Sequence, residues 1–327
     1  MSKKQIIFGI ALVILLSGLA FYAMNEKEKG STLNINDTAF SIQDTASIDK
    51  IFIASKFGWK SLLEKNNNGE WILNDKYRVN KMQLNILLKT LYWQRIKRPV
   101  HKGERESVIK SIATKGSKVE IYQSGELSKT FYVGGDAKDS KGTYFIMEGS
   151  ENPFVLYMPN HTGFLSPRYV VKEENYRHTQ IFGSNLKTFE EIKVSYPLNP
   201  SMGFIIKNED GNAGLVGIED YDQVALNNYV SSYNRIHITR YVEDDESIAI
   251  IDSLKAYPAH VEISVKDKKS SLSNSVKLYL REEDPDGMVG VANMEGDLRY
   301  VVVQKYIFNK LIVPVSSFRQ VSEISSS

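Results

Sequence analysis

The second half of this chain repeats the pattern of the first half at a constant offset. Asn80 precedes a stretch rich in leucine, and Asp222, 142 positions later, precedes an equivalent apolar stretch. The apolar positions of the two stretches correspond one to one: Leu84, Leu87, Leu88 and Leu91 against Leu226, Tyr229, Val230 and Tyr233. A period of this length is too long for a solenoid and predicts two copies of one domain.

The repeated stretch predicts a capped amphipathic helix in each copy. Apolar residues at i, i+3, i+4 and i+7 lie on one helical face, and an Asn or Asp oxygen accepts hydrogen bonds from the free N–H groups of the first turn. A second helix is predicted over residues 104–113. Its inward-facing residues and their second-copy counterparts keep the same offset: Val108, Ile109 and Ile112 against Ile250, Ile251 and Leu254.

Residues 118–169 predict an antiparallel meander, because four short apolar runs with a period of two alternate with turn residues. Residues 119–121 match residues 261–263 at the offset of 142, whereas Met147–Gly149 match Met294–Gly296 at an offset of 147. The offset thus increases by five, which means that the second copy has five additional residues. We place them in a hairpin loop around residues 266–274. The expected fold class is α+β, with an N-terminal transmembrane helix followed by two tandem duplicated modules. Each module has an antiparallel sheet (meander) with two helices on one face.

Residues 1–29 have the sequence pattern of a segment that enters a membrane. Ile6 to Met24 is uncharged and follows Lys3 and Lys4; as a helix it spans roughly 28 Å, close to the thickness of a bilayer core. We predict a single-pass protein of the inner (cytoplasmic) membrane, with the bulk of the chain periplasmic, that is extracytoplasmic. A cleaved signal peptide is the alternative. Lipid attachment through cysteine is excluded, since the chain has none.

The domain organisation expected from these patterns has five parts. They are a cytoplasmic tip and transmembrane anchor (1–29), a linker (30–45), a first module (46–172), a second, diverged copy (173–318) and a flexible tail (319–327).

Patterns for catalysis or cofactor binding are missing from the sequence. A net charge of +2 gives no strong field for nucleic acid. The five histidines lack metal-ligand spacing, and neither a phosphate-binding loop nor a G-x-S-x-G motif is present. The acidic run from Glu282 to Gly287 lacks the spacing of an EF-hand, so it favours a solvated turn over a calcium site. We therefore predict no catalytic residue, no cofactor and no metal.

One group of residues stands out as a possible contact surface. Tyr92 and Trp93 follow the buried face of the first helix and precede the basic residues Arg95, Lys97 and Arg98. Most aromatic residues of the chain lie at core-facing spacings, but exposed aromatics beside arginine are typical of protein interfaces. If exposed, these five residues form a possible interaction patch.

The chain resembles bacterial proteins carrying the domain of unknown function 4340. The resemblance depends on Gly69 and Trp71, on a helix ending near Ile96, and on the segments KVEIY, FYVGG, GTYFIMEG, PFVLYMP and GFLSPRY. It covers roughly residues 46–200 well. That family has no assigned activity, and its members are often encoded beside components of gliding-type ABC transporters. The resemblance therefore implies an accessory role, with the lipid bilayer and transporter permease components as partners.

Three functional hypotheses follow. The first is a membrane-anchored, extracytoplasmic, non-catalytic accessory or scaffold subunit of an ABC-type transporter or envelope complex. The alternative is a binding module for cell-wall glycan or peptide, which needs a solvent-facing aromatic cluster around Tyr92 and Trp93. The third is a hydrolase, which needs histidine and carboxylate side chains converging in one pocket.

Overall fold

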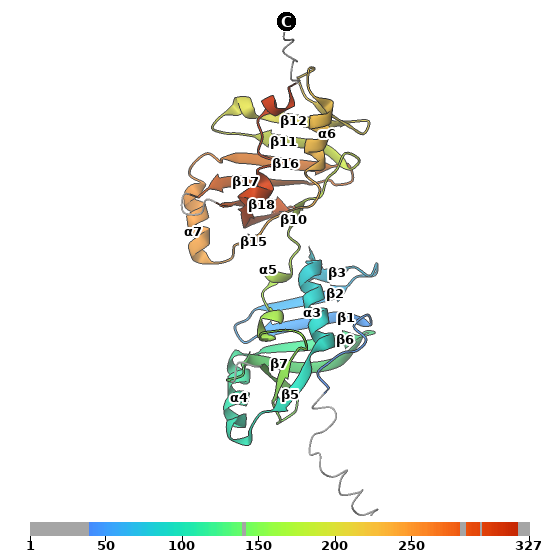
Figure 1. Cartoon of the computed structure of the whole chain (residues 1–327), viewed down its shortest axis with the longest axis vertical. Helices are drawn as coiled ribbons and strands as arrows, with labels where there is room; N and C mark the ends of the chain where they lie inside the picture. Colours follow the sequence, from blue (N-terminus) through green and yellow to red (C-terminus); the bar gives the residue numbers. More distant parts are fainter. Residues whose placement is uncertain (1–38, 139–141, 282–285, 295, 320–327) are drawn as a thin grey trace, which may run out of the picture. The chain divides into compact units, whose positions relative to one another are not determined.

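The computed structural model describes residues 39–138, 142–281, 286–294 and 296–319. The chain divides into two compact units, Met1–Tyr176 and Arg177–Ser327 (Figure 1). We call them unit 1 and unit 2.

The predicted fold class is wrong in two respects, the proportion of helix to sheet and the membrane-spanning helix. Antiparallel sheet dominates the described residues, with about 40% of the residues in strands and six helices. In the part of the chain that the structure describes, no helix is both long and apolar enough to cross a membrane. The predicted span from Ile6 to Met24 lies outside the described residues. Among the described residues, no membrane-spanning helix supports the predicted single-pass location at the inner membrane.

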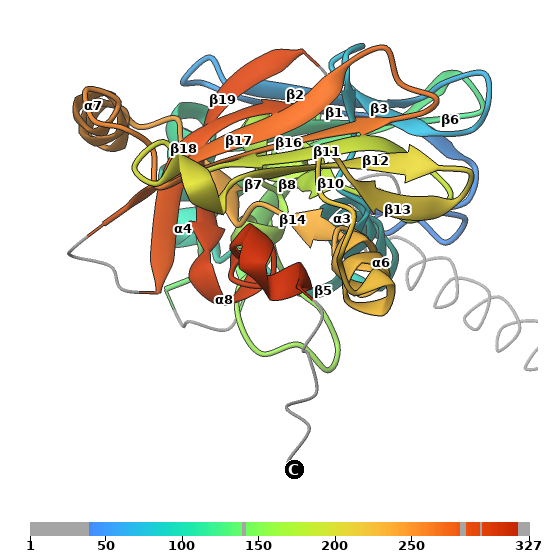
Figure 2. The same cartoon turned by 90° about the horizontal axis from the view of Figure 1, so that it is seen from above.

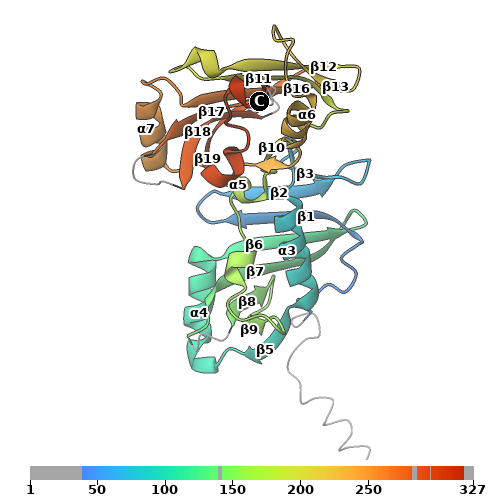
Figure 3. The same ribbon diagram turned by 45° about the horizontal axis from the view of Figure 1, so that its top comes forward.

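Unit 1 is built on one nine-stranded sheet, ordered β4-β3-β2-β1-β6-β7-β8-β9-β5, with every pair antiparallel (Figure 3). Its elements are β1 (Ile48–Ser55), β2 (Lys60–Lys65), β3 (Trp71–Leu73), β4 (Tyr77–Arg78), α3 (Lys81–Trp93), β5 (Arg95–Pro99), α4 (Lys102–Lys115), β6 (Ser117–Gln123), β7 (Glu126–Asp136), β8 (Thr143–Met147), β9 (Phe154–Tyr157), the 3-10 turn η1 (Ser166–Arg168) and α5 (Glu173–Tyr176).

The two long helices of unit 1, α3 and α4, cover opposite faces of this sheet, which corrects the prediction that both helices lie on one face. Phe145 of β8 packs in the core with Leu87 of α3. Its neighbour Tyr144 packs in a second cluster with Val108 and Ile112 of α4. Successive side chains of a strand point to opposite faces, so α3 and α4 lie on different sides.

Unit 2 repeats this plan with an eight-stranded sheet, ordered β13-β12-β11-β16-β17-β18-β19-β15. In Figure 2, α6 lies beside β13. The elements of unit 2 are β10 (Gln180–Phe182), β11 (Phe189–Ser195), the 3-10 turn η2 (Pro200–Met202), β12 (Phe204–Glu209), β13 (Asn212–Leu215), α6 (Gln223–Ser231), β14 (Ile236–His237), β15 (Arg240–Tyr241), α7 (Asp245–Leu254), β16 (Val261–Asp267), β17 (Ser273–Leu280), β18 (Gly287–Met294), β19 (Asp297–Gln304), α8 (Lys305–Phe308) and the 3-10 turn η3 (Val315–Phe318).

The strand registers align the two copies differently from the sequence comparison. The pairing of β1 with β6 has an irregularity between Ile48 and Lys50, and that of β11 with β16 has one between Phe189 and Glu191. Glu191 therefore takes the place of Lys50, 141 positions later. Likewise, β16 begins at residue 261, 144 positions after the start of β6 at residue 117. The predicted match of residues 119–121 with residues 261–263 is thus wrong by two positions, and two of the additional residues precede β16 rather than lying in its hairpin.

One aromatic residue near the start of each unit lies in its core. Phe40 is 1% exposed and contacts the rings of Phe131, Phe145 and Phe154. Phe182, 142 positions later, is also 1% exposed and contacts Tyr233. Buried rings of this size contribute strongly to stability. Phe40 and Ile42, which the prediction placed in a linker over residues 30–45, therefore belong to the core of unit 1.

The predicted helix caps are confirmed. The Asn80 side chain accepts hydrogen bonds from the N–H groups of Met82 and Gln83, and the Asp222 side chain accepts them from Val224 and Ala225. The backbone N–H of each cap residue is also hydrogen-bonded to an equivalent carbonyl in the two units. The Asn80 N–H donates to the carbonyl of Tyr176 at 2.7 Å, and the Asp222 N–H donates to that of Phe318, also at 2.7 Å. The two acceptors are again 142 positions apart.

A buried ion pair fixes the first residues of unit 2. The Arg177 guanidinium, with a side chain only 6% exposed, lies 2.6 Å from the Asp297 carboxylate and 4.6 Å from the centre of the Tyr241 ring. The Tyr241 hydroxyl donates to the carbonyl of His178 at 2.6 Å. Burial raises the pKa of Asp297, but hydrogen bonds from Arg299 and Arg177 outweigh this effect and lower the pKa overall.

Replacing either cap residue with alanine should destabilise its own unit by about 1 kcal/mol, because two N–H groups of the first turn lose their acceptor. Denaturant unfolding of Asn80→Ala and Asp222→Ala measures this loss. Asn234→Ala, at an exposed position outside the caps, is the matched control. Equal stability of all three variants and the unmodified protein would contradict the role given to the caps.

Arg177→Gln should lower the free energy of unfolding by about 3 kcal/mol at pH 7, because it leaves the partly buried Asp297 carboxylate with one cation fewer. The pKa of Asp297 is lowered in the folded state, so its stabilisation is complete above the unfolded value of about 3.9 and is lost as the pH falls through the folded value. The difference between Arg177→Gln and the unmodified protein should therefore shrink below about pH 4. Lys277→Gln removes an exposed ion pair and should change little. A difference that does not depend on pH would contradict this assignment.

Candidate interaction surface

The aromatic pair predicted from the sequence lies at the end of α3 and reaches solvent. Trp93 is 49% exposed, and Tyr92 is half-buried. Their rings meet edge to face, with centroids 4.8 Å apart. This geometry suits the positive edge and negative face of aromatic rings. It also holds the indole of Trp93 in a defined orientation at the surface.

Arg95 connects this pair to the helix end. Its Nη1 donates to the carbonyls of Tyr92 and Gln94 at 2.8 and 2.9 Å. These carbonyls lie where the helix leaves its last acceptors unpaired and where its dipole is negative, so a cation there is stabilising. The guanidinium also lies 5.9 Å from the centre of the Trp93 ring. Tyr92, Trp93 and Arg95 therefore form one contact cluster.

A buried glutamine fixes the base of this cluster. Gln94 is fully buried; its Nε2 donates to the carbonyl of Phe40 at 2.7 Å, and its Oε1 accepts from the Tyr169 hydroxyl at 2.6 Å. Burial raises the pKa of Tyr169 well above its usual range, so the hydroxyl remains a donor. Gln94 thus joins three segments of unit 1. Its role was not predicted, because nothing in a single glutamine between Trp93 and Arg95 indicates burial.

The remaining two predicted residues lie on β5, the last strand of the sheet of unit 1. Lys97 lies at an irregularity in the pairing of β5 with β9, between Ile96 and Arg98, and its side chain is exposed. Arg98 is half-buried, and its guanidinium donates to the carbonyl of Pro99 at 3.4 Å. Basic residues, a bulge and a proline are the features by which edge strands avoid indiscriminate pairing.

We call Tyr92, Trp93, Arg95, Lys97 and Arg98 together the Trp93 surface. The structure places all five at the end of α3 and along β5. Three of them contact one another directly, and the two others extend the positive charge along the edge strand. This arrangement can bind a partner by aromatic contact and by charge.

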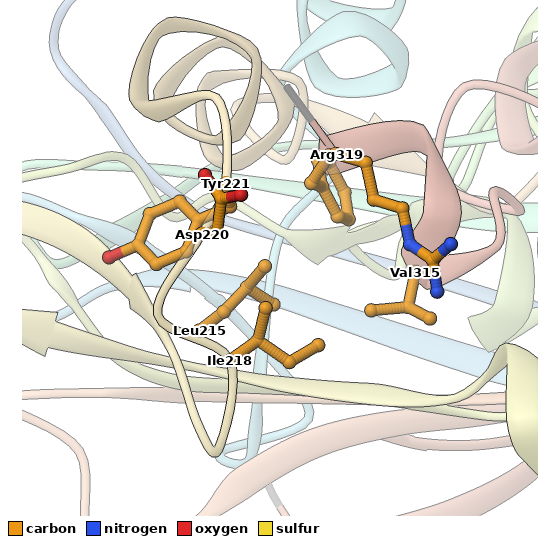
Figure 4. A pocket seen from close by; sticks show the side chains of 7 residues that line it. Leu215, Ile218, Asp220, Tyr221, Val315 and Arg319 are labelled. Atoms are coloured by element: carbon orange, nitrogen blue, oxygen red, sulfur yellow. The ribbon is translucent and has the colours of Figure 1, made fainter. Parts of the chain in front are cut away.

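Unit 2 contains a hollow of about 340 Å³ between the end of β13 and η3. Figure 4 shows Leu215, Ile218 and Val315 in it, with Asp220, Tyr221 and Arg319 around them. Phe318 completes the lining. The lining contains Asp220 and Tyr221 but no serine, cysteine or histidine, so a Ser–His or Cys–His pair is not present in it.

A second hollow of unit 2, of about 500 Å³, lies along β11 and the loop that follows it. Its Tyr196 is already engaged, because the hydroxyl donates to the carbonyl of Val313 at 2.8 Å. Burial raises the pKa of Tyr196 to about 12. This tyrosine is therefore a structural hydrogen-bond donor rather than an acid or base near neutral pH.

Two of the five histidines come together, although they are 59 positions apart in the sequence. The rings of His178 and His237 are 6.1 Å apart, and Nδ1 of His237 lies 3.1 Å from the hydroxyl of Thr179. Burial lowers the pKa of His237. Among the described residues, no group of three or more His, Cys, Asp or Glu side chains could hold a metal ion. Most of the predicted turn at Glu282–Gly287 lies outside them.

A second exposed aromatic pair was not predicted from the sequence. Phe57 and Trp59 are 65% and 49% exposed in the connection between β1 and β2. The signal that could have identified them is the run Lys56-Phe57-Gly58-Trp59-Lys60 between two predicted strands.

No family model, curated protein or solved structure matches this chain.

Gln94→Leu should cost about 3 kcal/mol of stability, because it leaves the Tyr169 hydroxyl and the Phe40 carbonyl buried without a partner. Removing the hydroxyl as well, in Gln94→Leu/Tyr169→Phe, should restore part of this loss. A double-mutant cycle from denaturant unfolding measures the coupling. Additive losses would show that the two side chains do not depend on each other.

Proposed function

We propose that this protein is a non-catalytic accessory or scaffold subunit that binds a partner protein through the Trp93 surface. The observation that carries the proposal is Trp93 itself, 49% exposed and held by Tyr92 and Arg95. Tryptophan and arginine are enriched among the residues that dominate binding at protein interfaces. A side chain held in place before binding loses less entropy on association.

The charge of the surface indicates the kind of partner. Arg95, Lys97 and Arg98 lie within four positions of one another, on the edge strand. An acidic partner would associate faster with such a surface, and a partner of like charge would be disfavoured. The resemblance to the domain of unknown function 4340 favours a component of an ABC-type transporter or envelope complex as that partner.

Binding of cell-wall glycan or peptide is the second candidate, and the exposure of Trp93 favours it. Stacking of a sugar needs an open aromatic face. Here the Arg95 guanidinium lies over the indole, and the Tyr92 ring meets it at an interplanar angle of 83°. These neighbours leave less of the ring open for a sugar, so we rank protein binding first. A hydrolase has less support, because neither of the two hollows described above is lined by a histidine together with a carboxylate.

Site-specific photo-crosslinking of the full-length protein in its native cells tests the proposal. A photoreactive amino acid replaces Trp93 in one variant, Lys97 in a second and Tyr306 in a control. Tyr306 is an exposed aromatic of unit 2, 73% exposed. We expect the same acidic partner in adducts from positions 93 and 97 and its absence from position 306.

A second measurement gives the contribution of the tryptophan. Trp93→Ala should weaken recovery of that partner roughly 30-fold, the effect of losing a residue that dominates an interface, while Tyr306→Ala should not. Adducts shared by all three positions, or wild-type recovery with Trp93→Ala, would refute the proposal. Sedimentation with purified cell wall that depends on Trp93 would instead favour the glycan hypothesis.

A further inference from the structure

The connection between β1 and β2 is an ordered turn with every residue exposed. Residues 56–60 are all solvent-exposed. The Ser55 N–H donates to the carbonyl of Trp59 at 2.9 Å, and the Gly58 N–H donates to that of Ser55 at 3.3 Å. Gly58 has a φ of +86°, a conformation that glycine adopts without steric cost. The backbone therefore holds this turn in one shape at the end of a hairpin.

The turn presents two aromatic rings beside cations. Phe57 and Trp59 are 65% and 49% exposed, with ring centroids 5.8 Å apart. The ammonium of Lys172 lies 4.5 Å from the centre of the Trp59 ring. We call residues 56–60 with Lys172 the basic–aromatic tip.

The positive charge of the tip is only partly compensated. Lys172 lies 3.6 Å from the Glu174 carboxylate. Within the described ranges, no carboxylate forms an ion pair with Lys56 or Lys60. The excess charge therefore comes from these two lysines, one on each side of the aromatic pair.

We propose that the basic–aromatic tip binds the surface of a lipid bilayer that contains anionic phospholipids. Tryptophan and phenylalanine beside lysine suit this boundary, because rings enter the interfacial layer while ammonium groups remain among the head groups. Basic residues near an anionic surface each raise affinity roughly fivefold. The contact is peripheral and requires no membrane-spanning helix.

The composition and charge of the tip favour a bilayer as its occupant. Its two rings lie in an exposed hairpin turn with a lysine on each side, which suits the interfacial layer and the anionic head groups of a bilayer. A bilayer needs no complementary shape, so two exposed rings and these lysines are sufficient for weak, reversible binding. The equivalent connection in unit 2 exposes Leu198 at 72% but contains no lysine between Tyr196 and Gly203.

Quenching of Trp59 fluorescence by lipids with brominated acyl chains tests this proposal directly. The full-length protein is mixed with vesicles of brominated phosphatidylcholine, with or without phosphatidylglycerol. The chain has 3 tryptophans, so the Trp59 signal is the difference between the unmodified protein and Trp59→Phe. This readout reports the position of the tip even where another segment also contacts the vesicle.

We expect quenching that requires phosphatidylglycerol and disappears in Trp59→Phe. Lys56→Ser/Lys60→Ser should raise the vesicle concentration for half-maximal quenching roughly 20-fold. Tyr306→Ala, an exposed aromatic next to Lys305, and Trp93→Ala should each keep the Trp59 signal, which separates this proposal from the role of the Trp93 surface. Circular dichroism checks that each variant is folded.

Three outcomes would overturn the proposal. They are quenching of equal size in neutral vesicles, quenching that persists unchanged in Trp59→Phe, and no quenching by any vesicle. If the last were accompanied by crosslinks from position 59 to an acidic protein, the tip would be assigned to a protein partner instead.

Discussion

The pairing of β1 with β6, and of β11 with β16, is the interaction on which both units depend. These strands are central in their sheets, yet the chain between them forms two helices and the strands at both edges of the sheet. Such pairing is costly in chain entropy, because a long loop must close before any contact forms. The apolar faces of α3 and α4 offset this cost by covering the two sides of the sheet. α3 shares its core with β1 and β6, whereas α4 packs on β7 and β8, the strands that continue the sheet from β6.

Local patterns could be predicted, and contacts between distant segments could not. The spacing of Leu84 to Leu91 and the oxygen of Asn80 specify a capped helix within one short stretch of the chain, so no tertiary information was needed. The placement of α4 on the opposite face was missed, because the apolar face of a helix does not identify which side of a sheet it meets. Arg177 and Asp297 are 120 positions apart, and each resembles a surface charge in sequence. For the Trp93 surface, the residues could be predicted but not the support from Gln94.

The two copies have diverged while keeping the physical role of particular positions. Lys50 lies opposite Glu64 in unit 1, 2.8 Å away, and in unit 2 the directly paired residues are Glu191 and Lys207, 3.9 Å apart. The pair has the same place in the sheet with its charges exchanged. Opposite charges on neighbouring strands attract in either order, whereas two like charges repel. Exchange therefore preserves the interaction although neither residue type is kept.

The burial of Phe40 has a consequence for how the chain can be divided. A fragment that begins at residue 46 would lack Phe40 and Ile42, both at most 3% exposed. It would also leave the carbonyl of Leu91 without the N–H of Ile42. In unit 2 the corresponding buried aromatic residue is Phe182, only five positions after Arg177. Each copy is thus complete only with the short segment that precedes the first strand of its large sheet. Recombination or domain transfer would have to preserve that segment together with the sheet.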